Sequence, residues 1–209
     1  MYVESRVELN LPKSKILNLI REPGNLNKYH PFCKKNEIIN WPGNGSVDHL
    51  EYHNGMKFNR EFYNWTDNGY DLRIGAKRNM AIVNWVVEGD ESRSSLRDRI
   101  NPNIKNYIPI ENILIQRLFW FLYIKPMLQS YINHVIKGFN HYMKTETNVL
   151  RNQFGTHRWF SYLVQMNRRS FLKGLLFISS IFTFKLKASR KNNVSFNYGV
   201  ASGDPTNTN

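Results

Sequence analysis

Cysteine is almost absent from this chain, since Cys33 is the only one in 209 residues. A disulfide within the chain and a metal site built from several cysteines are therefore excluded. The sequence also lacks a glycine-rich phosphate loop, because Gly43 and Gly45 fall in a turn, and it lacks a nucleophile elbow. RNP-like, zinc-finger and helix-turn-helix patterns are missing as well. No single motif therefore indicates catalysis, and we expect no cofactor and no catalytic residue.

Acidic residues are scarce, with 16 against 29 basic ones, for a net charge of +13. Residues 166–209 carry seven basic side chains and one acidic one, whereas residues 1–165 carry 22 and 15. A strongly basic chain can contact nucleic acid or anionic lipid. Without a nucleic-acid motif, we interpret the excess as a solvated basic surface and expect no nucleic-acid partner.

Alternating apolar residues and turn residues predict a run of short strands after a first strand and a helix. The first strand is Val3–Leu9, and Pro12 opens a helix that Pro23 and Gly24 end. Tight turns between consecutive strands indicate an antiparallel meander. The remaining strands are expected at 36–41, 47–53, 56–65, 70–76, 80–88 and 92–101.

The spacing of apolar residues then becomes helical and predicts a long amphipathic helix over 125–148. Tyr131 and Val135 belong to its apolar stripe. Residues 114–124 are apolar and aromatic, and their periodicity leaves a helix, a flap and a buried strand open. A curved sheet can wrap around one long helix, with side chains or a cavity between them.

Two charged residues interrupt the apolar alternation of the strands: Arg60 lies between Phe58 and Phe62, and Asp98 lies between Leu96 and Ile100. If these strands turn that face inward, both charges become polar anchors in a ligand cavity. The alternative, which we favour from the sequence, turns the other face inward, so that Tyr63 and Trp65 pack in the core. Trp85, with Val83 and Val87, is expected in the core.

The six histidines show no metal-ligand spacing beside a carboxylate. His49 and His53 are four apart on a strand, and His134 and His141 are seven apart on the long helix. We expect no metal site, and we expect Cys33 to be a small core residue.

The order of elements resembles the START-like, or SRPBCC, superfamily, which includes polyketide cyclase/dehydrase-like and lipid-transfer proteins. The residues that carry the resemblance are VELNLPKSKI at 7–16, NLNKYHPF at 25–32, IKPM at 124–127 and VIKGFNHY at 135–142. The resemblance implies an α+β helix-grip fold, in which a curved antiparallel sheet wraps around a long C-terminal helix. It also implies a cavity for a hydrophobic small molecule or lipid.

Within that resemblance we expect binding or transport of the ligand without catalysis. The alternative is a cyclase- or dehydratase-like enzyme that uses Arg60, Asp98 or a histidine as an acid–base group. The residues expected to contact the ligand are Arg60, Phe62, Trp85, Asp98, Tyr131 and Val135.

Residues 167–173, NRRSFLK, resemble the twin-arginine export motif, and an 11-residue apolar run at 174–184 follows them. That run suits a signal peptide and is too short to cross a bilayer. Export would depend on Arg168, Arg169, Phe171 and Leu172. The alternative is an amphipathic helix at a membrane surface. Residues 196–206, FNYGVASGDPT, resemble the start of mature PhoD-type alkaline phosphatases.

We therefore expect a ligand-binding domain at 1–150, a connector at 151–165, a signal-like helix at 166–189, and a disordered phosphatase-like start at 190–209. Such a phosphatase fragment is inactive because its metal ligands would lie farther downstream. An export signal is read from a free N-terminus, and Met166 could begin one. Two joined genes and a genuine fusion remain open. Residues 1–165 are expected in the cytoplasm, whereas 166–189 would contact a membrane or an export translocase.

Overall fold

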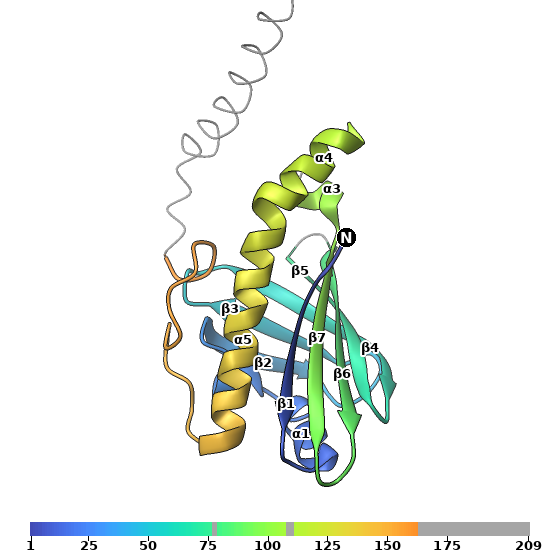
Figure 1. Cartoon of the computed structure of the whole chain (residues 1–209), viewed down its shortest axis with the longest axis vertical. Helices are drawn as coiled ribbons and strands as arrows, with labels where there is room; N and C mark the ends of the chain where they lie inside the picture. Colours follow the sequence, from blue (N-terminus) through green and yellow to red (C-terminus); the bar gives the residue numbers. More distant parts are fainter. Residues whose placement is uncertain (77–78, 108–110, 163–209) are drawn as a thin grey trace, which may run out of the picture. The chain divides into compact units, whose positions relative to one another are not determined.

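The alternating strands form one seven-stranded antiparallel sheet in the computed structural model, which describes residues 1–76, 79–107 and 111–162 (Figure 1). The strand order is β1-β7-β6-β5-β4-β3-β2, so the meander is confirmed and the first strand pairs with the last. Strand ends differ from the expected ones by a few residues. The strands are β1 (Val3–Leu9), β2 (Cys33–Asn40), β3 (Val47–Tyr52), β4 (Lys57–Thr66), β5 (Gly69–Gly75), β6 (Asn79–Gly89) and β7 (Ser94–Pro102).

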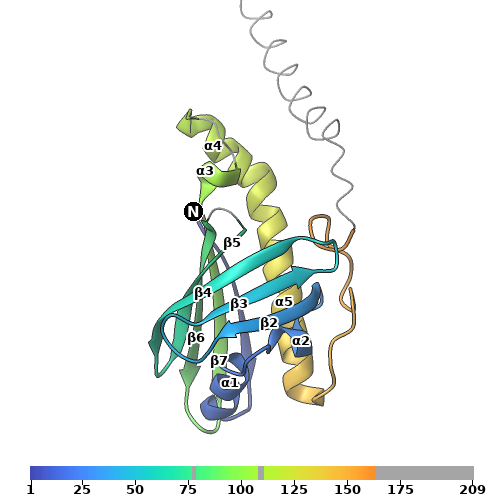
Figure 2. The ribbon, with the colours of Figure 1, turned by 180° about the vertical axis from the view of Figure 1, so that it is seen from behind.

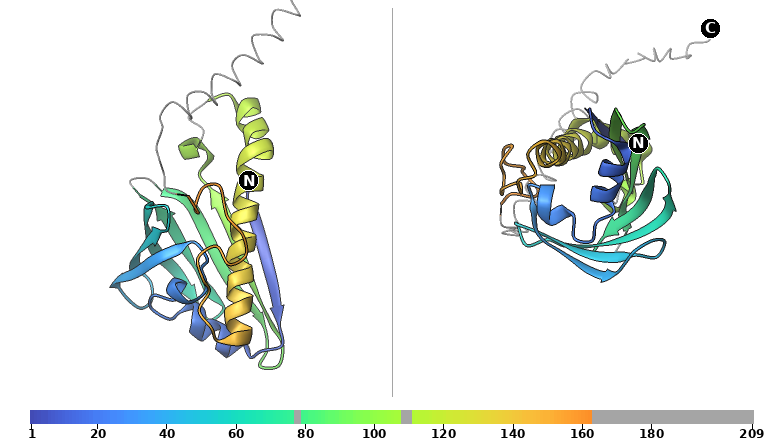
Figure 3. Two further views of the ribbon diagram at one scale, coloured as in Figure 1. Left: turned by 90° about the vertical axis from the view of Figure 1, so that its left-hand side faces the viewer. Right: turned by 90° about the horizontal axis from the view of Figure 1, so that it is seen from below.

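The long helix α5 (Lys125–Thr145) lies on the inner face of this sheet, which curls toward it (Figures 1 and 3). It ends earlier than expected, because Glu146 has a left-handed backbone with φ 55°. Residues 114–124, for which the sequence left a helix, a flap and a buried strand open, are helical. Helix α4 (Ile113–Phe119) continues through a π-helical turn, η1 (Trp120–Ile124), into α5. This is the α+β helix-grip fold.

Short helices α1 (Lys13–Ile20) and α2 (Leu26–Tyr29) lie at one end of the sheet (Figure 2), and α3 (Ile104–Tyr107) follows β7. Helix α2 approaches α5 so closely that a Cβ atom on Gly138 would stand 2.1 Å from the carbonyl oxygen of Tyr29. Glycine is therefore required at this contact. One end of the space between sheet and helix is closed in this way.

The face of β4 and β7 that turns inward is the one that carries the charges, so the interpretation favoured from the sequence was wrong. Arg60 and Asp98 are buried on the side of α5. Tyr63 is partly exposed, and the guanidinium of Arg73 lies 4.3 Å from its ring centre. A bulge after Tyr63 breaks the alternation, which lets Trp65 pack against Phe62 on the inner side.

Residues 146–162, here called the strap, run back along α5 (Figure 1). The backbone amide of Val149 donates to the carbonyl of Lys28 (2.8 Å), and that of Asn152 donates to the carbonyl of Pro31 (3.0 Å). The compact unit extends over Met1–Val164. Residues 151–162, expected as a connector, are thus part of the domain. The signal-like helix and tail lie outside the described residues.

Candidate functional site: the cavity between sheet and helix

A cavity of about 70 Å³ lies between the sheet and α5. Most of its lining is aliphatic or aromatic, and six side chains add hydroxyl, imidazole, guanidinium or carboxyl groups. These six are His30, Tyr52, Arg60, Asp98, Tyr107 and Tyr131. The remaining lining is Leu26, Leu50, Phe58, Leu72, Ile74, Met80, Ala81, Val83, Trp85, Ile100, Leu128, Val135 and Phe160.

The cavity is small for a ligand site, since such sites usually measure roughly 300–1,000 Å³. Aromatic rings fill the rest of the space. The ring of Phe160, from the strap, lies 4.6 Å from the ring centres of both Tyr52 and Tyr131. In this conformation Phe160 of the strap fills space beside the cavity, and a ligand larger than a few atoms requires lining side chains such as Phe160 to move.

Asp98 is the unusual group of the cavity. It lies on β7 opposite Trp85 of β6 and is only 3% exposed. Its Oδ1 atom has no hydrogen-bond partner among the described residues. Burial raises the pKa of this carboxyl well above its usual value. Burial thus favours the protonated form of Asp98, and in that form the carboxyl can donate one hydrogen bond and accept another.

Arg60 keeps its charge because its partner is buried with it. Asp48 lies opposite it on β3, and Arg60 Nε and Nη2 donate to the two oxygens of Asp48 at 2.8 and 2.5 Å. Nη2 also donates to Asn36 Oδ1 (3.3 Å). The carboxylate raises the pKa of Arg60 against the opposing effect of burial. This bidentate pair brings no net charge to the cavity.

A hydrogen-bonded chain of three side chains forms a second polar group. The backbone amide of Phe32 donates to His30 Nδ1 (3.2 Å), so the hydrogen of the neutral ring sits on Nε2 and is donated to the Tyr131 hydroxyl (2.9 Å). Burial lowers the pKa of His30 to about 3, which keeps the ring neutral. The hydroxyls of Tyr52 and Tyr131 lie 2.9 Å apart. Only one of the two hydroxyl hydrogens can lie between these oxygens, so the second hydroxyl hydrogen remains available to a ligand.

Five of the six residues expected to contact a ligand line this one cavity. They are Arg60, Trp85, Asp98, Tyr131 and Val135. Phe62 lies beside it instead, buried between the rings of Trp41 and Tyr70, whose centres are both 5.0 Å away. Contact with a ligand remains a prediction for all six. Arg168, Arg169, Phe171 and Leu172, expected in the export signal, lie outside the described residues.

Sequence reasoning missed Asp48, Tyr52, His30 and Phe160 as residues of the site. Asp48 shares its strand face with Leu50 and Tyr52, and this alternation was the signal that could have placed it inward. His30 stands in the short connection between α2 and β2, and Phe160 follows the expected domain end. Their positions follow from tertiary packing and leave no periodic signal.

Other chemistry-bearing side chains lie apart from the cavity lining. Cys33 is half-buried, and burial raises the pKa of its thiol to about 12, so it stays protonated. His134 Nδ1 lies 2.6 Å from the carbonyl of Ser130 in its own helix. Within the described ranges no cluster of histidine, cysteine and carboxylate side chains could hold a metal ion. No described helix is long and apolar enough to cross a membrane.

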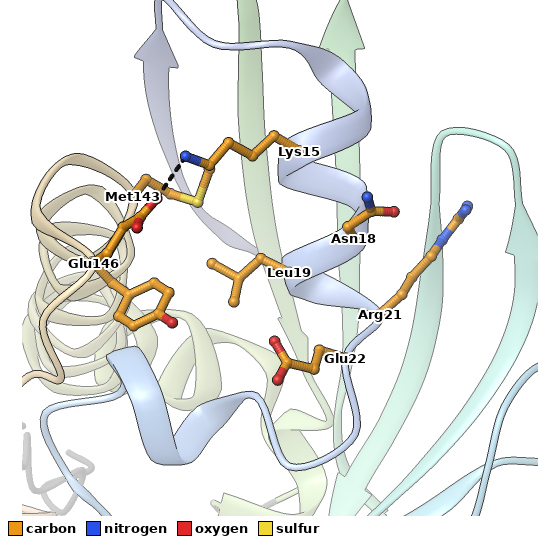
Figure 4. A pocket seen from close by; sticks show the side chains of 8 residues that line it. Lys15, Asn18, Leu19, Arg21, Glu22, Met143 and Glu146 are labelled. Atoms are coloured by element: carbon orange, nitrogen blue, oxygen red, sulfur yellow. Dashed lines mark hydrogen bonds and ion pairs between the residues drawn. The ribbon is translucent and has the colours of Figure 1, made fainter.

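A second hollow of about 640 Å³ lies on the surface between α1 and the end of α5 (Figure 4). Its floor is formed by Leu19 and Met143, and an ion pair between Lys15 and Glu146 (2.9 Å) crosses it. The charged groups of that pair are solvent-exposed and already matched to each other. The internal cavity is therefore the stronger candidate for a ligand.

The sequence matches no protein-family model and no curated protein. Solved structures are nevertheless similar in fold. A START superfamily protein from Mycobacterium smegmatis matches with a TM-score of 0.53 and 13% identity, over 70% of this chain and 99% of its own. DynU16, from the dynemicin biosynthetic locus, matches with a TM-score of 0.53 and 12% identity over 72% of this chain. The di-domain ARO/CYC protein BexL, from the BE-7585A biosynthetic pathway, matches with 0.51 and 10% over 70%.

This chain spans about half the length of DynU16 and BexL, 51% and 48% respectively. These likenesses show that residues of this chain adopt the START-like helix-grip fold. The same fold carries many functions, so the chemistry has to be argued from the cavity.

Proposed function

We propose that this domain binds an apolar, uncharged small molecule that carries one oxygen function. The observation that supports the proposal is a mostly apolar internal cavity in which the buried carboxyl of Asp98 has an oxygen without a partner among the described residues. A buried polar group without a partner costs free energy, and a bound ligand can supply the missing partner.

The polar groups of the cavity define the chemistry of the ligand. Asp98 and the tyrosine pair of Tyr52 and Tyr131 each offer a hydrogen-bond donor, which suits a carbonyl or hydroxyl oxygen. Arg60 is already neutralised by Asp48, so the carboxylate of a fatty acid would find no free positive charge. A ketone, an alcohol or a sterol-like molecule therefore fits better than an ionised lipid.

The test uses a cavity-filling substitution. Ala81 lines the cavity and is buried, so Ala81→Leu should fill the space and abolish binding of a neutral fluorescent probe such as 1-aminoanthracene. Ala76→Leu is the matched control, because Ala76 is exposed on the neighbouring strand end. Mass spectrometry of an organic extract of the purified protein identifies the natural ligand. Equal probe binding by both variants and the wild type would show that the cavity is not the binding site.

A second function, acid catalysis of a cyclase or dehydratase type, is favoured by the same residue. A carboxyl that stays protonated in an apolar cavity can donate a proton to a carbonyl or a leaving hydroxyl. With the extracted ligand or a polyketide-like ketone as substrate, Asp98→Asn should abolish turnover and retain binding. Unchanged turnover would contradict acid catalysis by Asp98, and only the binding function would remain.

For residues 166–189 we propose an export signal, supported by the paired arginines ahead of a short apolar run. Placed at the N-terminus of a reporter, residues 166–209 should direct export that is lost when Arg168 and Arg169 are both changed to lysine. Export that survives this change would leave only a general basic and apolar segment.

A further inference from the structure

The outer side of the helical segment 113–126 is apolar, although it faces solvent. Leu114, Leu118 and Leu122 follow one another at intervals of four residues and are 70%, 49% and 72% exposed. Ile113 and Phe121 stand beside them, 54% and 62% exposed. Residues four apart lie on one side of a helix, so these five side chains form one continuous surface, here called the outer apolar face.

The opposite side of the same segment already has its packing partners. Gln116, Trp120, Ile124 and Leu128 follow at the same four-residue interval and are buried. The helix is thus apolar on both sides, and the outer apolar face is covered by nothing in the described part of the chain. Large exposed apolar surfaces of this kind mark interaction sites.

Both charged side chains within the segment that carries the outer apolar face are positive. Arg117 and Lys125 lie on the exposed side, and the Lys125 ammonium lies 5.7 Å from the centre of the Phe121 ring. Residues 112–140 contain no acidic side chain, and the exposed Glu111, two residues before Ile113, is the nearest one before them. Apolar side chains interspersed with lysine and arginine are the combination that binds anionic lipid surfaces.

We infer that the outer apolar face of α4 and η1 docks on an anionic membrane surface. The leucines and Phe121 would enter the boundary between headgroups and acyl chains, and Arg117 and Lys125 would pair with lipid phosphates. A second copy of the chain fits less well, since residues 1–165 carry 22 basic and 15 acidic residues. Residues 166–209, with seven basic residues and one acidic, are also of like charge.

The position of this helix connects the docking surface to the cavity. Helix α4 extends past the strand ends (Figures 1 and 2). On the inner side, the Tyr123 hydroxyl accepts a hydrogen bond from Trp159 Nε1 (3.3 Å), and the next strap residue, Phe160, lines the cavity. Docking therefore places the strap, which contributes Phe160 to the cavity lining, beside the bilayer. The docking itself does not depend on the proposed ligand.

Sedimentation with phosphatidylcholine vesicles, with and without phosphatidylserine, tests the inference on the full chain. Because the apolar run 174–184 can bind lipid by itself, the comparison is made in a Leu175→Asp/Leu176→Asp background. In that background we expect binding that requires phosphatidylserine. Adding Leu118→Ser and Leu122→Ser should weaken it about tenfold or more. Ile39→Ser with Leu150→Ser, which removes two exposed apolar side chains elsewhere, should change it by less than about twofold.

Two charge-reversal variants on one helix complete the test. Lys125→Glu should weaken binding to phosphatidylserine vesicles several-fold, whereas Lys137→Glu, the same change on the exposed side of α5, should have little effect. Melting curves confirm that the variants fold. The inference is overturned if the background protein does not bind, or if it binds as well after the two leucines are replaced. Sedimentation velocity that shows a dimer lost in that leucine variant would assign the face to a second copy instead.

Discussion

Asp98 is the residue whose chemistry depends most on where the fold places it. In the sequence it is one acid on an alternating strand. In the folded chain its Oδ1 has no partner in the described structure, and burial raises the pKa of the carboxyl well above its usual value. Its neighbour in the cavity, Arg60, shows the opposite outcome, because Asp48 matches its charge. Each of these two arrangements makes a prediction about stability.

Replacing Asp98 by asparagine should remove a pH dependence of stability. The folded carboxyl has a raised pKa, so above the unfolded value of about 4 the unfolded chain releases a proton that the folded chain keeps. The wild type therefore loses stability as pH rises through this window, by about 1.4 kcal/mol per pH unit, and Asp98→Asn does not. Urea denaturation of both proteins between acidic and mildly alkaline pH measures the difference. A difference that stays constant with pH would mean that Asp98 is ionised in the folded state.

The pair of Arg60 and Asp48 should be strongly coupled. Removing one partner leaves the other charge buried, which costs about 3–5 kcal/mol. We expect Arg60→Met and Asp48→Leu each to destabilise the domain by that amount, and the double variant to lose much less than the sum. A double-mutant cycle by urea denaturation measures the coupling. Additive losses would show that the two side chains contribute independently.

At the scale of elements, the strap adds a side chain to the cavity lining that neither the sheet nor α5 provides. Phe160 inserts between β3 and α5, and the Asn54 side chain holds the strap by donating to the carbonyl of Trp159 (2.5 Å). The π-helical turn η1 contributes Tyr123 to the same contact. Such turns often occur at functional sites.

Truncation of the Phe160 ring should destabilise the domain and enlarge the cavity. Phe160→Ala should lower the free energy of unfolding by about 3 kcal/mol, since a large buried ring is lost. It should also tighten binding of a neutral fluorescent probe, because the cavity becomes larger. Phe154→Ala is the control: that ring lies on the strap against His141, away from the cavity lining, and should leave probe binding unchanged. Weaker probe binding by Phe160→Ala would show that the ring contacts the ligand rather than blocking it.

At the scale of the whole molecule, the compact unit includes the strap. A protein that ends at Tyr162 should therefore keep the melting temperature of the full chain within a few degrees. A protein that ends at Thr145 removes the strap with Phe160 and the buried His157, and it should melt much lower. Differential scanning calorimetry of the two truncated proteins and the full chain makes the comparison. A large loss on removing residues 163–209 alone would show that those residues stabilise the domain.

The strands, the meander and the long helix could be predicted from the sequence, because periods of two and about 3.6 residues report directly on which side of an element is buried. The inward positions of Trp85, Tyr131 and Val135 followed from the same periods. Those of Arg60 and Asp98 did not: the interpretation favoured from the sequence turned the other face of β4 and β7 inward, since a face that carries Arg60 costs free energy unless a partner is buried with it.

Only the tertiary structure supplied that partner, Asp48 on the neighbouring strand, and so decided which face turns inward. It also decided the fate of residues that carry no period: His30 is held by Tyr131 across the cavity, and Phe160 enters it from a strap without helix or strand. Such contacts join segments far apart in the chain, and local residue patterns contain no record of them. Composition and periodicity therefore determined the antiparallel meander and the long helix, and the family resemblance implied the helix-grip arrangement, whereas the pairing of buried charges and the position of Phe160 in the cavity were decided by packing.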